Sequence, residues 1–183
     1  NKFNHETKKE VKRILRENDV IKIIFNNDKE FIVDKVILAT HADQALRLLE
    51  CPTADELKIL SQFKYTKNTA YLHSDQKMMP KNKNVWSSWN FIANESNQNT
   101  FSLTYWMNRL QNIDSTNNYF VSINPNTVPS KYYDKTVFEH PIFNLDTLEA
   151  QKNLSKIQGV KNTYYCGSYF GYGFHEDGIQ SSA

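Results

Sequence analysis

The apolar and polar positions near the start of the chain predict three short strands. Residues Val20–Phe25 are β-branched or aromatic, Asn26–Asp28 carries turn-forming side chains, and Phe31–Val33 resumes the apolar pattern, which together predict a hairpin. The next apolar run, Lys35–Ala39, is almost uninterrupted. Such a run is expected for a strand that is buried on both faces.

Helical spacing occurs in three other places. Leucine and alanine positions predict helices over Asp43–Leu49 and Ala54–Phe63. Residues Thr147–Ile157 return to this spacing, and Gly159 follows as a natural C-terminal cap. The segment Glu6–Glu17 also places apolar residues at helical spacing, but its apolar part is short enough to form a strand instead.

Over residues 69–143 the chain changes to short aromatic segments joined by polar, asparagine-rich connections. These predict the antiparallel strands of a separate lobe, at Ala70–His73, Val85–Phe91, Thr100–Met107 and Tyr119–Ile123. In the third segment Leu103 and Tyr105 alternate with Ser102 and Thr104. One face of that strand is therefore apolar, and the other face can line a pocket.

Composition and charge narrow the function classes. The 183 residues are 39% hydrophobic, 13% aromatic and 23% charged, as in a globular protein, and no apolar run approaches the ~20 residues of a membrane span. The net charge is only +2 and the basic residues are scattered, so we expect no nucleic-acid partner. Cys51 and Cys166 lie far apart without metal-ligand spacing, which favours buried thiols in a reducing compartment, the cytoplasm.

All five glycines lie in the last 25 residues, at positions 159, 167, 171, 173 and 178. Residues Tyr164–Ile179 therefore predict a strand, a flexible loop and an acidic helix start, which lets backbone N–H groups approach a ligand. Three more specific motifs are not matched by this segment. Glu176 stands at the third glycine position of G-x-G-x-x-G, and Ile179 stands where a P-loop has lysine and a zinc protease its second histidine. Spacing alone is equally compatible with a surface loop that binds nothing.

Two segments, Val36–Leu46 and Tyr164–Ile179, resemble the later part of flavin-containing amine oxidase-type proteins. The particular likeness is to a bacterial branch of predicted NAD/FAD-binding proteins. Four shorter stretches fit it as well: Tyr71–His73, Met79-Pro80, Trp86–Asn90 and Tyr105–Leu110. The resemblance therefore covers essentially the whole chain, and its terminal run is specific.

The resemblance implies that the chain carries one half of an FAD site. The strand end at Ala39 and Thr40 would lie near the cofactor's phosphates. Gly167 and Ser168 would lie near the ribityl or pyrophosphate group. Many relatives have an acidic residue where Ser168 stands, so a hydroxyl makes that contact more weakly here, or another group makes it.

The helix start after the glycine-rich loop would meet the flavin itself. The resemblance places the amides of Gly178 and Ile179 near the isoalloxazine edge, where a helix N-terminus stabilises negative charge on the reduced ring. Tyr169 and Tyr172 stand where the family often has aromatic residues beside the flavin. Because hydride transfer to a flavin needs no protein nucleophile, no catalytic residue is assigned.

The other half of the site is missing from these 183 residues. The family's first element, a strand followed by G-x-G-x-x-G and later an acidic residue for the ribose, does not occur in the sequence. The chain begins at Asn1 without a signal sequence and stops at Ala183, inside the expected last helix. We therefore expect a carboxy-terminal part of a longer enzyme, without tight FAD affinity of its own.

Aromatic residues of the middle lobe are candidates for a substrate wall. Trp86, Trp89, Tyr105 and Trp106 supply apolar area with a polar handle, although the core of a β-rich lobe would use the same residues. The lysines at 77, 81 and 83 fit a solvated basic loop better than a flavin-proximal lysine. The histidines at 41, 73, 140 and 175 lack metal-ligand spacing, so no metal is expected.

We therefore predict an α+β fold. Residues 1–50 and 159–183 would be C-terminal pieces of a Rossmann-like FAD-binding domain, and residues 51–158 an antiparallel or mixed β-sheet substrate lobe with flanking helices. The predicted function is FAD-dependent oxidation of a C–N or C–C bond in a largely apolar small molecule. The alternatives are a flavin desaturase that modifies fatty-acyl groups and a non-catalytic module that binds an apolar ligand or a protein.

Overall fold

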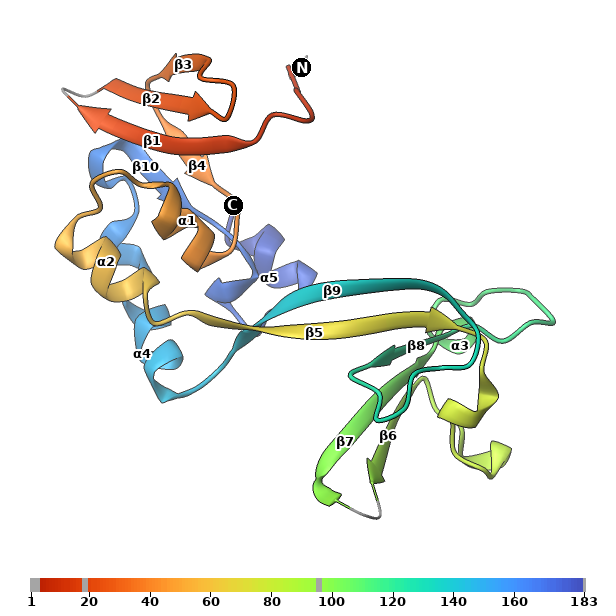
Figure 1. The fold of residues 1–183 in the computed structure, drawn as a ribbon. Coiled ribbons are helices and arrows are strands. Elements are labelled where there is room, and N and C mark those ends of the chain that lie inside the picture. Colours follow the sequence, from red (N-terminus) through yellow and green to blue (C-terminus); the bar gives the residue numbers. More distant parts are fainter. Residues whose placement is uncertain (1–3, 18–19, 95–96, 183) are drawn as a thin grey trace. The chain divides into compact units, whose positions relative to one another are not determined.

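The computed structural model describes residues 4–17, 20–94 and 97–182, with the side chains of 94–101 left out. The chain forms two compact units (Figure 1). Unit 1 combines the chain up to Tyr65 with the chain from Pro141 onward, and unit 2 is Thr66–His140. These boundaries differ from the predicted ones at residues 50 and 158. The functions assigned to those segments stay predictions.

Both units mix helices and strands, and the α+β class is confirmed. From the start of the chain to Tyr65, unit 1 contains β1 (Val11–Glu17), β2 (Val20–Phe25), β3 (Glu30–Val33), β4 (Val36–Leu38), α1 (Ala42–Leu48) and α2 (Ala54–Leu60). Its second part contains α4 (Leu145–Asn153), β10 (Thr163–Tyr165) and α5 (His175–Gln180), with 3-10 turns at Leu154–Ile157, Val160–Asn162 and Ser168–Phe170. No helix in the described part of the chain has the length and apolar character that a membrane crossing needs.

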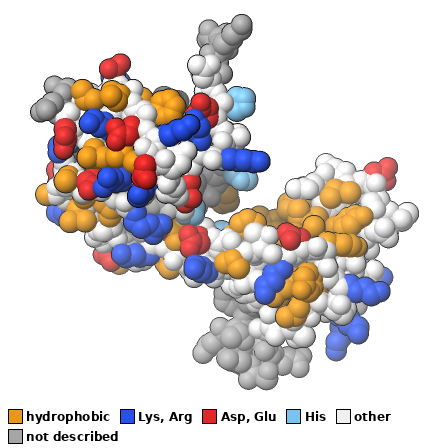
Figure 2. All heavy atoms as spheres, turned by 45° about the horizontal axis from the view of Figure 1, so that its top comes forward, with side chains coloured by type: hydrophobic (Ala, Val, Ile, Leu, Met, Phe, Trp, Pro, Cys, Tyr) orange, Lys and Arg blue, Asp and Glu red, His pale blue; other side chains and the backbone are white. Residues whose placement is uncertain are grey.

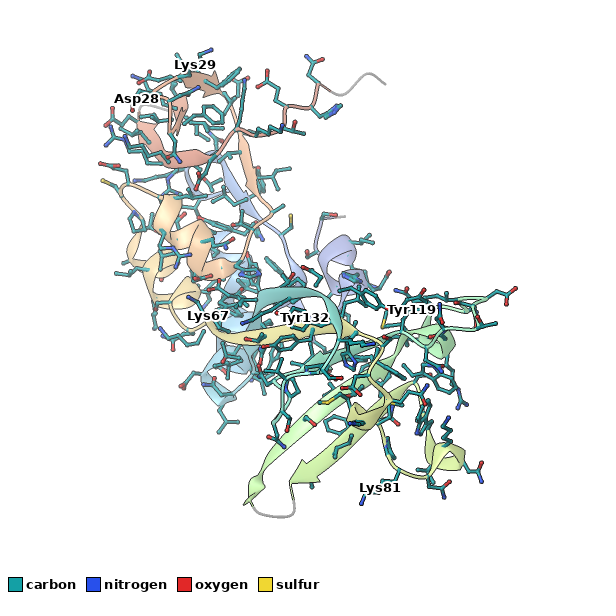
Figure 3. The ribbon with its side chains drawn as sticks, turned by 45° about the vertical axis from the view of Figure 1, so that its right-hand side comes forward. Asp28, Lys29, Lys67, Lys81, Tyr119 and Tyr132 are labelled. Carbon is teal, nitrogen blue, oxygen red and sulfur yellow. The ribbon has the colours of Figure 1, made fainter. Side chains whose placement is uncertain are left out.

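Unit 1 holds two sheets. Strands β1, β2 and β3 form an antiparallel sheet, and β4 pairs in parallel with β10. The predicted hairpin is confirmed as β2 and β3, with Asp28 at positive φ in the turn, beside Lys29 (Figure 3). The ambiguous segment 6–17 contains β1, because its apolar residues pair with β2 rather than forming a helical stripe.

The core of unit 1 forms where β1 and β2 pack against the helices. Ala42 and Ala45 of α1 and Leu60 of α2 are fully buried, as the apolar spacing of both helices predicts. The prediction for Lys35–Ala39 is wrong in one respect. Val36 and Leu38 are buried but Ile37 is 66% exposed, because only one face of β4 packs on this core.

A buried ion pair joins three elements of this core. The two terminal nitrogens of the Arg16 guanidinium on β1 donate to the carboxylate of Glu56 on α2, at 2.5 and 2.8 Å. The Tyr165 hydroxyl on β10 donates to the same carboxylate at 2.6 Å. Burial alone would raise the pKa of Glu56, but the hydrogen bonds from Arg16 and Tyr165 outweigh burial and lower it to about 2. The carboxylate is therefore ionised inside the core.

Unit 2 is built on the sheet of order β6-β7-β8-β5-β9. Its strands are β5 (Lys64–His73), β6 (Trp89–Asn94), β7 (Asn97–Trp106), β8 (Phe120–Ile123) and β9 (Tyr132–Ile142), and a short helix α3 (Met107–Leu110) follows β7. The predicted strand Val85–Phe91 is wrong in its first half, because Lys83–Val85 forms a 3-10 turn and the Trp86 indole donates to the Pro80 carbonyl. Strand β9 was not predicted.

The buried face of this sheet combines a polar row with the apolar cluster of Met79, Trp86 and Phe120, whereas the open face is apolar. Residues that pair across β6, β7, β8 and β5 share a face. One face carries two apolar rows, Trp89, Tyr105, Val121 and Leu72, then Phe91, Leu103, Ile123 and Ala70. The other face carries the row Asn90, Thr104, Ser122 and Tyr71. The row with the polar side chains is buried, whereas Trp89 and Phe91 on the apolar face are 50% and 64% exposed.

Candidate functional site

The two predicted cofactor regions meet at one end of the parallel sheet in unit 1, where both strands finish. Strands β4 and β10 run parallel, and the Cys166 N–H donates to the Leu38 carbonyl at 3.2 Å. Their carboxyl ends therefore lie together, with Ala39 and Thr40 after one strand and Gly167 after the other. In open sheets of parallel strands, ligands bind just outside the carboxyl ends of the strands.

At this end of the sheet, the backbone of Gly167 lies close to Thr40 and to the ring of Tyr169. A Cβ added to Gly167 would lie 3.4 Å from the Thr40 carbonyl oxygen and only 2.7 Å from the ring of Tyr169. No side chain fits there, so the position requires glycine. The structure thus brings Thr40 and Gly167 together, as the resemblance implies, while their role toward a cofactor stays a prediction.

Helix α5 packs against the same glycine. A Cβ on Gly178 would make ordinary contacts, 3.6 Å from the Ser168 nitrogen and 3.9 Å from the Gly167 carbonyl carbon. The backbones of Gly167, Ser168 and Gly178 therefore adjoin one another. Tyr172 is 80% exposed and Ile179 is 66% exposed, so both side chains are available to a ligand.

Three polar side chains hold the glycine-rich loop in shape. The Asp177 carboxylate accepts the N–H groups of Tyr172 and Phe174, and Gln151 on α4 donates to two loop carbonyls. The Ser181 hydroxyl accepts the Gly167 N–H at 2.9 Å. Sequence reasoning missed all three. Only Asp177 had a local signal, since an acidic residue three positions after a helix start commonly caps it.

Tyr169 lies in the core. Its side chain is 2% exposed and its ring centroid lies 5.0 Å from that of Phe63. Its buried hydroxyl has no hydrogen-bond partner among the described residues, and burial raises its pKa. Of the two tyrosines predicted beside the flavin, only Tyr172 has an exposed ring.

The contacts at this junction suit some parts of FAD better than others. The absence of side chains at Gly167 and Gly178 suits the close approach of a flat or neutral group. The first turn of α5 already carries two carboxylates, Glu176 and Asp177, and the Gly167 N–H is already bonded. The residues therefore fit the ribityl and ring parts of the cofactor better than its negatively charged pyrophosphate.

The four aromatic candidates of unit 2 divide between the two faces of the sheet. Trp86 is 8% exposed, and it packs edge to face on Trp106 and Phe120 under the buried face. Trp89 and Tyr105 pair across β6 and β7 on the open face, with ring centroids 5.3 Å apart. Only Trp89 and Tyr105 can therefore contribute to an open apolar wall. On the other face, Ser102 lines a cavity of about 660 Å³ together with Asp75 and Val128.

A buried histidine and serine in unit 2 resemble a catalytic pair in composition. His73 Nε2 lies 2.8 Å from Ser122 Oγ, which lies 2.7 Å from Thr104 Oγ1. His73 Nδ1 accepts the Asp75 N–H, so the ring proton is on Nε2 and points at the serine. A histidine that donates to serine does not activate it, and burial lowers the pKa of His73. The arrangement is therefore a structural hydrogen-bond chain.

Among the described residues, the remaining histidine, cysteine and carboxylate side chains do not gather at one place. The described residues contain no cluster of histidine, cysteine and carboxylate side chains that suits a metal ion. Cys166 is buried and Cys51 is exposed, both as free thiols. The expectation of buried thiols is therefore wrong for Cys51, which follows α1 at the surface.

Comparison with known proteins finds a likeness in structure. No protein family matches the sequence, and no curated protein matches it. A CLA-producing fatty acid isomerase from P. acnes has a TM-score of 0.62 at 12% identity, over 95% of this chain and 45% of that chain. Wild-type putrescine oxidase bound to putrescine gives 0.63 at 11%, over 94% and 46%. Cyclohexylamine oxidase from Brevibacterium oxydans gives 0.61 at 7%, over 93% and 45%.

The likeness is one of fold. At these identities the shared feature is the arrangement of helices and strands, and the chain spans under half the length of each of the three structures. Two of the three are amine oxidases by name, the class that the sequence motifs resemble. The α+β architecture of the chain therefore matches part of the fold of such enzymes.

Proposed function

We propose that this chain is part of an FAD-dependent oxidoreductase of the amine-oxidase type and supplies the ring-side part of its cofactor site. The observation that carries the proposal is the junction of Thr40, Gly167 and Gly178. There the ends of two parallel strands and the helix α5 lie close to one another, with no side chain on either glycine. The fold likeness to two amine oxidases supports it. The activity belongs to a longer protein, since the phosphate-binding glycine loop is not in these residues.

The residues of the chain would bind and orient the cofactor. FAD, when bound, supplies a ring that accepts a hydride from the substrate. Gly167 and Gly178 leave room for that group, and the exposed side chains of Tyr172 and Ile179 would cover it. Asp177 and Ser181 keep the loop in this shape through their hydrogen bonds to its amides.

The proposed substrate is a largely apolar small molecule whose C–N or C–C bond is oxidised. The open face of the unit 2 sheet supports this choice, because Trp89 and Tyr105 stand there among aliphatic side chains. A fatty-acyl substrate is a second candidate. The specific observation that favours it is the fold likeness to a fatty acid isomerase.

Gly178 offers the sharpest test. In the polypeptide translated from the complete reading frame, we expect Gly178→Leu to lower the FAD content per chain at least ~10-fold, a loss of about 1.4 kcal/mol of binding. The reason is that a side chain there projects from the backbone that adjoins Ser168. Gly178→Ala should keep the fold, since its Cβ makes ordinary contacts and alanine favours helix by up to about 1 kcal/mol. The measurement is flavin absorbance per protein.

The matched control is Gln180→Leu, an exposed position on the same helix. Equal FAD content in the Gly178→Leu and Gln180→Leu variants would contradict the assigned contact. Complete absence of flavin from the wild-type full-length protein would instead favour a non-catalytic binding module. A stoichiometric flavin spectrum from the purified 183-residue chain would overturn the view that the cofactor needs a further segment.

A further inference from the structure

Unit 2 has an open cavity of about 660 Å³ beside its sheet, a volume typical of sites for small molecules. Strands β6 and β7 provide one wall, which includes Ile92 and Ser102, and the segments that follow β5 and β8 provide the rest. One of these segments carries Lys81, which is labelled in Figure 3. Ser102 alternates with Leu103 along β7, so the cavity lies on the face of the sheet opposite Trp89.

Ser102 brings a buried hydroxyl to this cavity. The residue is only 5% exposed. The next residue on the same face of β7, Thr104, has its hydroxyl oxygen 2.7 Å from Ser122 Oγ. Ser102 Oγ, by contrast, has no hydrogen-bond partner within the part of the chain that the structure describes. Because a buried hydroxyl without a partner costs free energy, this one is suited to bind a polar atom of a molecule that enters the cavity.

Two lysines make the cavity positively charged. The side chains of Lys77 and Lys81 line it, both residues are exposed, and neither ammonium group forms an ion pair with another described residue. The cavity's other charged side chain is Asp75. Two lysines against one aspartate leave one positive charge in excess. The cavity therefore favours a ligand with a single negative charge.

Asp75 itself fixes two walls of the cavity to each other. One oxygen of its carboxylate accepts the Lys77 N–H at 3.0 Å, and the other accepts the N–H and the hydroxyl of Ser130 at 2.9 and 2.7 Å. These hydrogen bonds, those from Ser130 most strongly, lower the pKa of Asp75 and keep it ionised. Its oxygens are thus used within the wall, and the two ammonium groups are left for a ligand.

We propose that this cavity binds a small amphipathic carboxylate. Lys77 and Lys81 neutralise its head group, Ser102 hydrogen-bonds to the bound molecule, and Ile92 and Val128 contact its apolar part. A carboxylate matches the single excess positive charge, whereas a phosphate monoester carries a charge of about −1.5 to −2 at neutral pH. The site uses no group of the proposed cofactor site, so it does not depend on the proposed function.

Octanoate is the probe that tests this, and octyltrimethylammonium has the same chain with the opposite charge. In equilibrium dialysis against the polypeptide translated from the complete reading frame, octanoate should bind saturably and at least ~10-fold more tightly, about 1.4 kcal/mol. The double variant Lys77→Gln, Lys81→Gln should lose this preference. The matched control is Lys67→Gln, at an exposed position on β5 outside the cavity, which should leave octanoate binding unchanged.

Two further variants locate the bound molecule. Ser102→Ala should weaken octanoate binding severalfold, and Ser87→Ala, at an exposed position outside the cavity, should not. Trp89→Ser alters only the opposite face of the sheet and should have no effect. Equal binding of the two probes, or unchanged octanoate binding in the double lysine variant or in Ser102→Ala, would overturn the proposal. Loss of octanoate binding in Trp89→Ser would place the molecule on the open face and overturn it as well.

Discussion

The buried carboxylate of Glu56 on α2 accepts hydrogen bonds from Arg16 on β1 and Tyr165 on β10 and so links the three elements. It is 0% exposed, yet it accepts hydrogen bonds from Arg16, Tyr165 and the Thr53 backbone. A buried ion pair is weak evidence for net stability, but removing one partner leaves the other charge uncompensated. This residue therefore makes the folding of unit 1 depend on pH.

The pH dependence has a definite sign. The folded pKa of Glu56 is about 2, below its ordinary value of 4.5. Its contribution to folding is therefore fully present above pH 4.5 and is lost as the pH falls through 2. We expect the free energy of unfolding of the wild-type chain to drop by roughly 3 kcal/mol over this range from Glu56 alone. Urea unfolding at a series of pH values measures it.

Two variants identify the group responsible. Glu56→Gln should be destabilised by roughly 3 kcal/mol or more at neutral pH, because Arg16 stays buried without its counter-charge, and it should lack this acid-dependent loss. Glu149→Gln removes a carboxylate whose pKa is lowered by Lys152 at the surface. Its unfolding curves should follow the wild type. An unchanged acid slope in Glu56→Gln would show that other groups carry it.

At the scale of elements, the sequence pattern predicted those helices and strands whose conformation depends on residues close by in the chain. The β2–β3 hairpin and helices α1 and α2 follow from turn residues and apolar spacing within a few positions. The segment 6–17 stayed ambiguous because its pairing partner, β2, decides its conformation. Strand β9 was missed because most of its side chains are exposed and carry no clear alternation. Apolar Ile37 was expected inside because sequence does not show which face is covered.

The candidate site was predictable to a similar extent. The resemblance identified Thr40, Gly167 and Gly178, and the structure places these backbones together. The side chains that hold the loop, Gln151 and Ser181, were not predictable, since each acts on residues from 14 to 20 positions away. Such contacts exist only after the chain has folded.

Gln158 allows a prediction about an element. Its amide makes two hydrogen bonds to Tyr165, part-buried at the edge of β10. Gln158→Ala should lower the free energy of unfolding by about 1–3 kcal/mol and expose the edge of β10, which promotes self-association. Unfolding in urea and sedimentation velocity measure the two effects. Gln62→Ala is the control, because the Gln62 side chain, just after α2, donates one exposed hydrogen bond to the Lys58 carbonyl. Equal losses in both variants would refute the edge role.

At the scale of the whole chain, apolar surface is the main feature to explain. Apolar side chains lie exposed among charged ones on the visible face of the molecule (Figure 2). In unit 2 the exposed set includes Trp89 and Phe91 on the open face of the sheet. Exposed apolar area gathered on one face usually marks a binding site or an interface.

We therefore expect the chain to bind a hydrophobic fluorescent dye through unit 2. Trp89→Ser should reduce the dye fluorescence severalfold and change the melting temperature little, since the ring is half exposed. Phe120→Ala, in the fully buried face, should instead cost roughly 3–5 kcal/mol of stability. If Trp89→Ser left dye binding unchanged, the open face would not be the dye's site.

The polar row on the buried face of the unit 2 sheet also bears on the life of the chain in a cell. A buried row of hydrogen-bonded polar side chains fixes the strands in register, so the sheet can form before anything covers its apolar face. Until then that face is the kind of surface that chaperones and proteases recognise. Loss of stability in unit 2 should therefore lower the abundance of the chain in a cell.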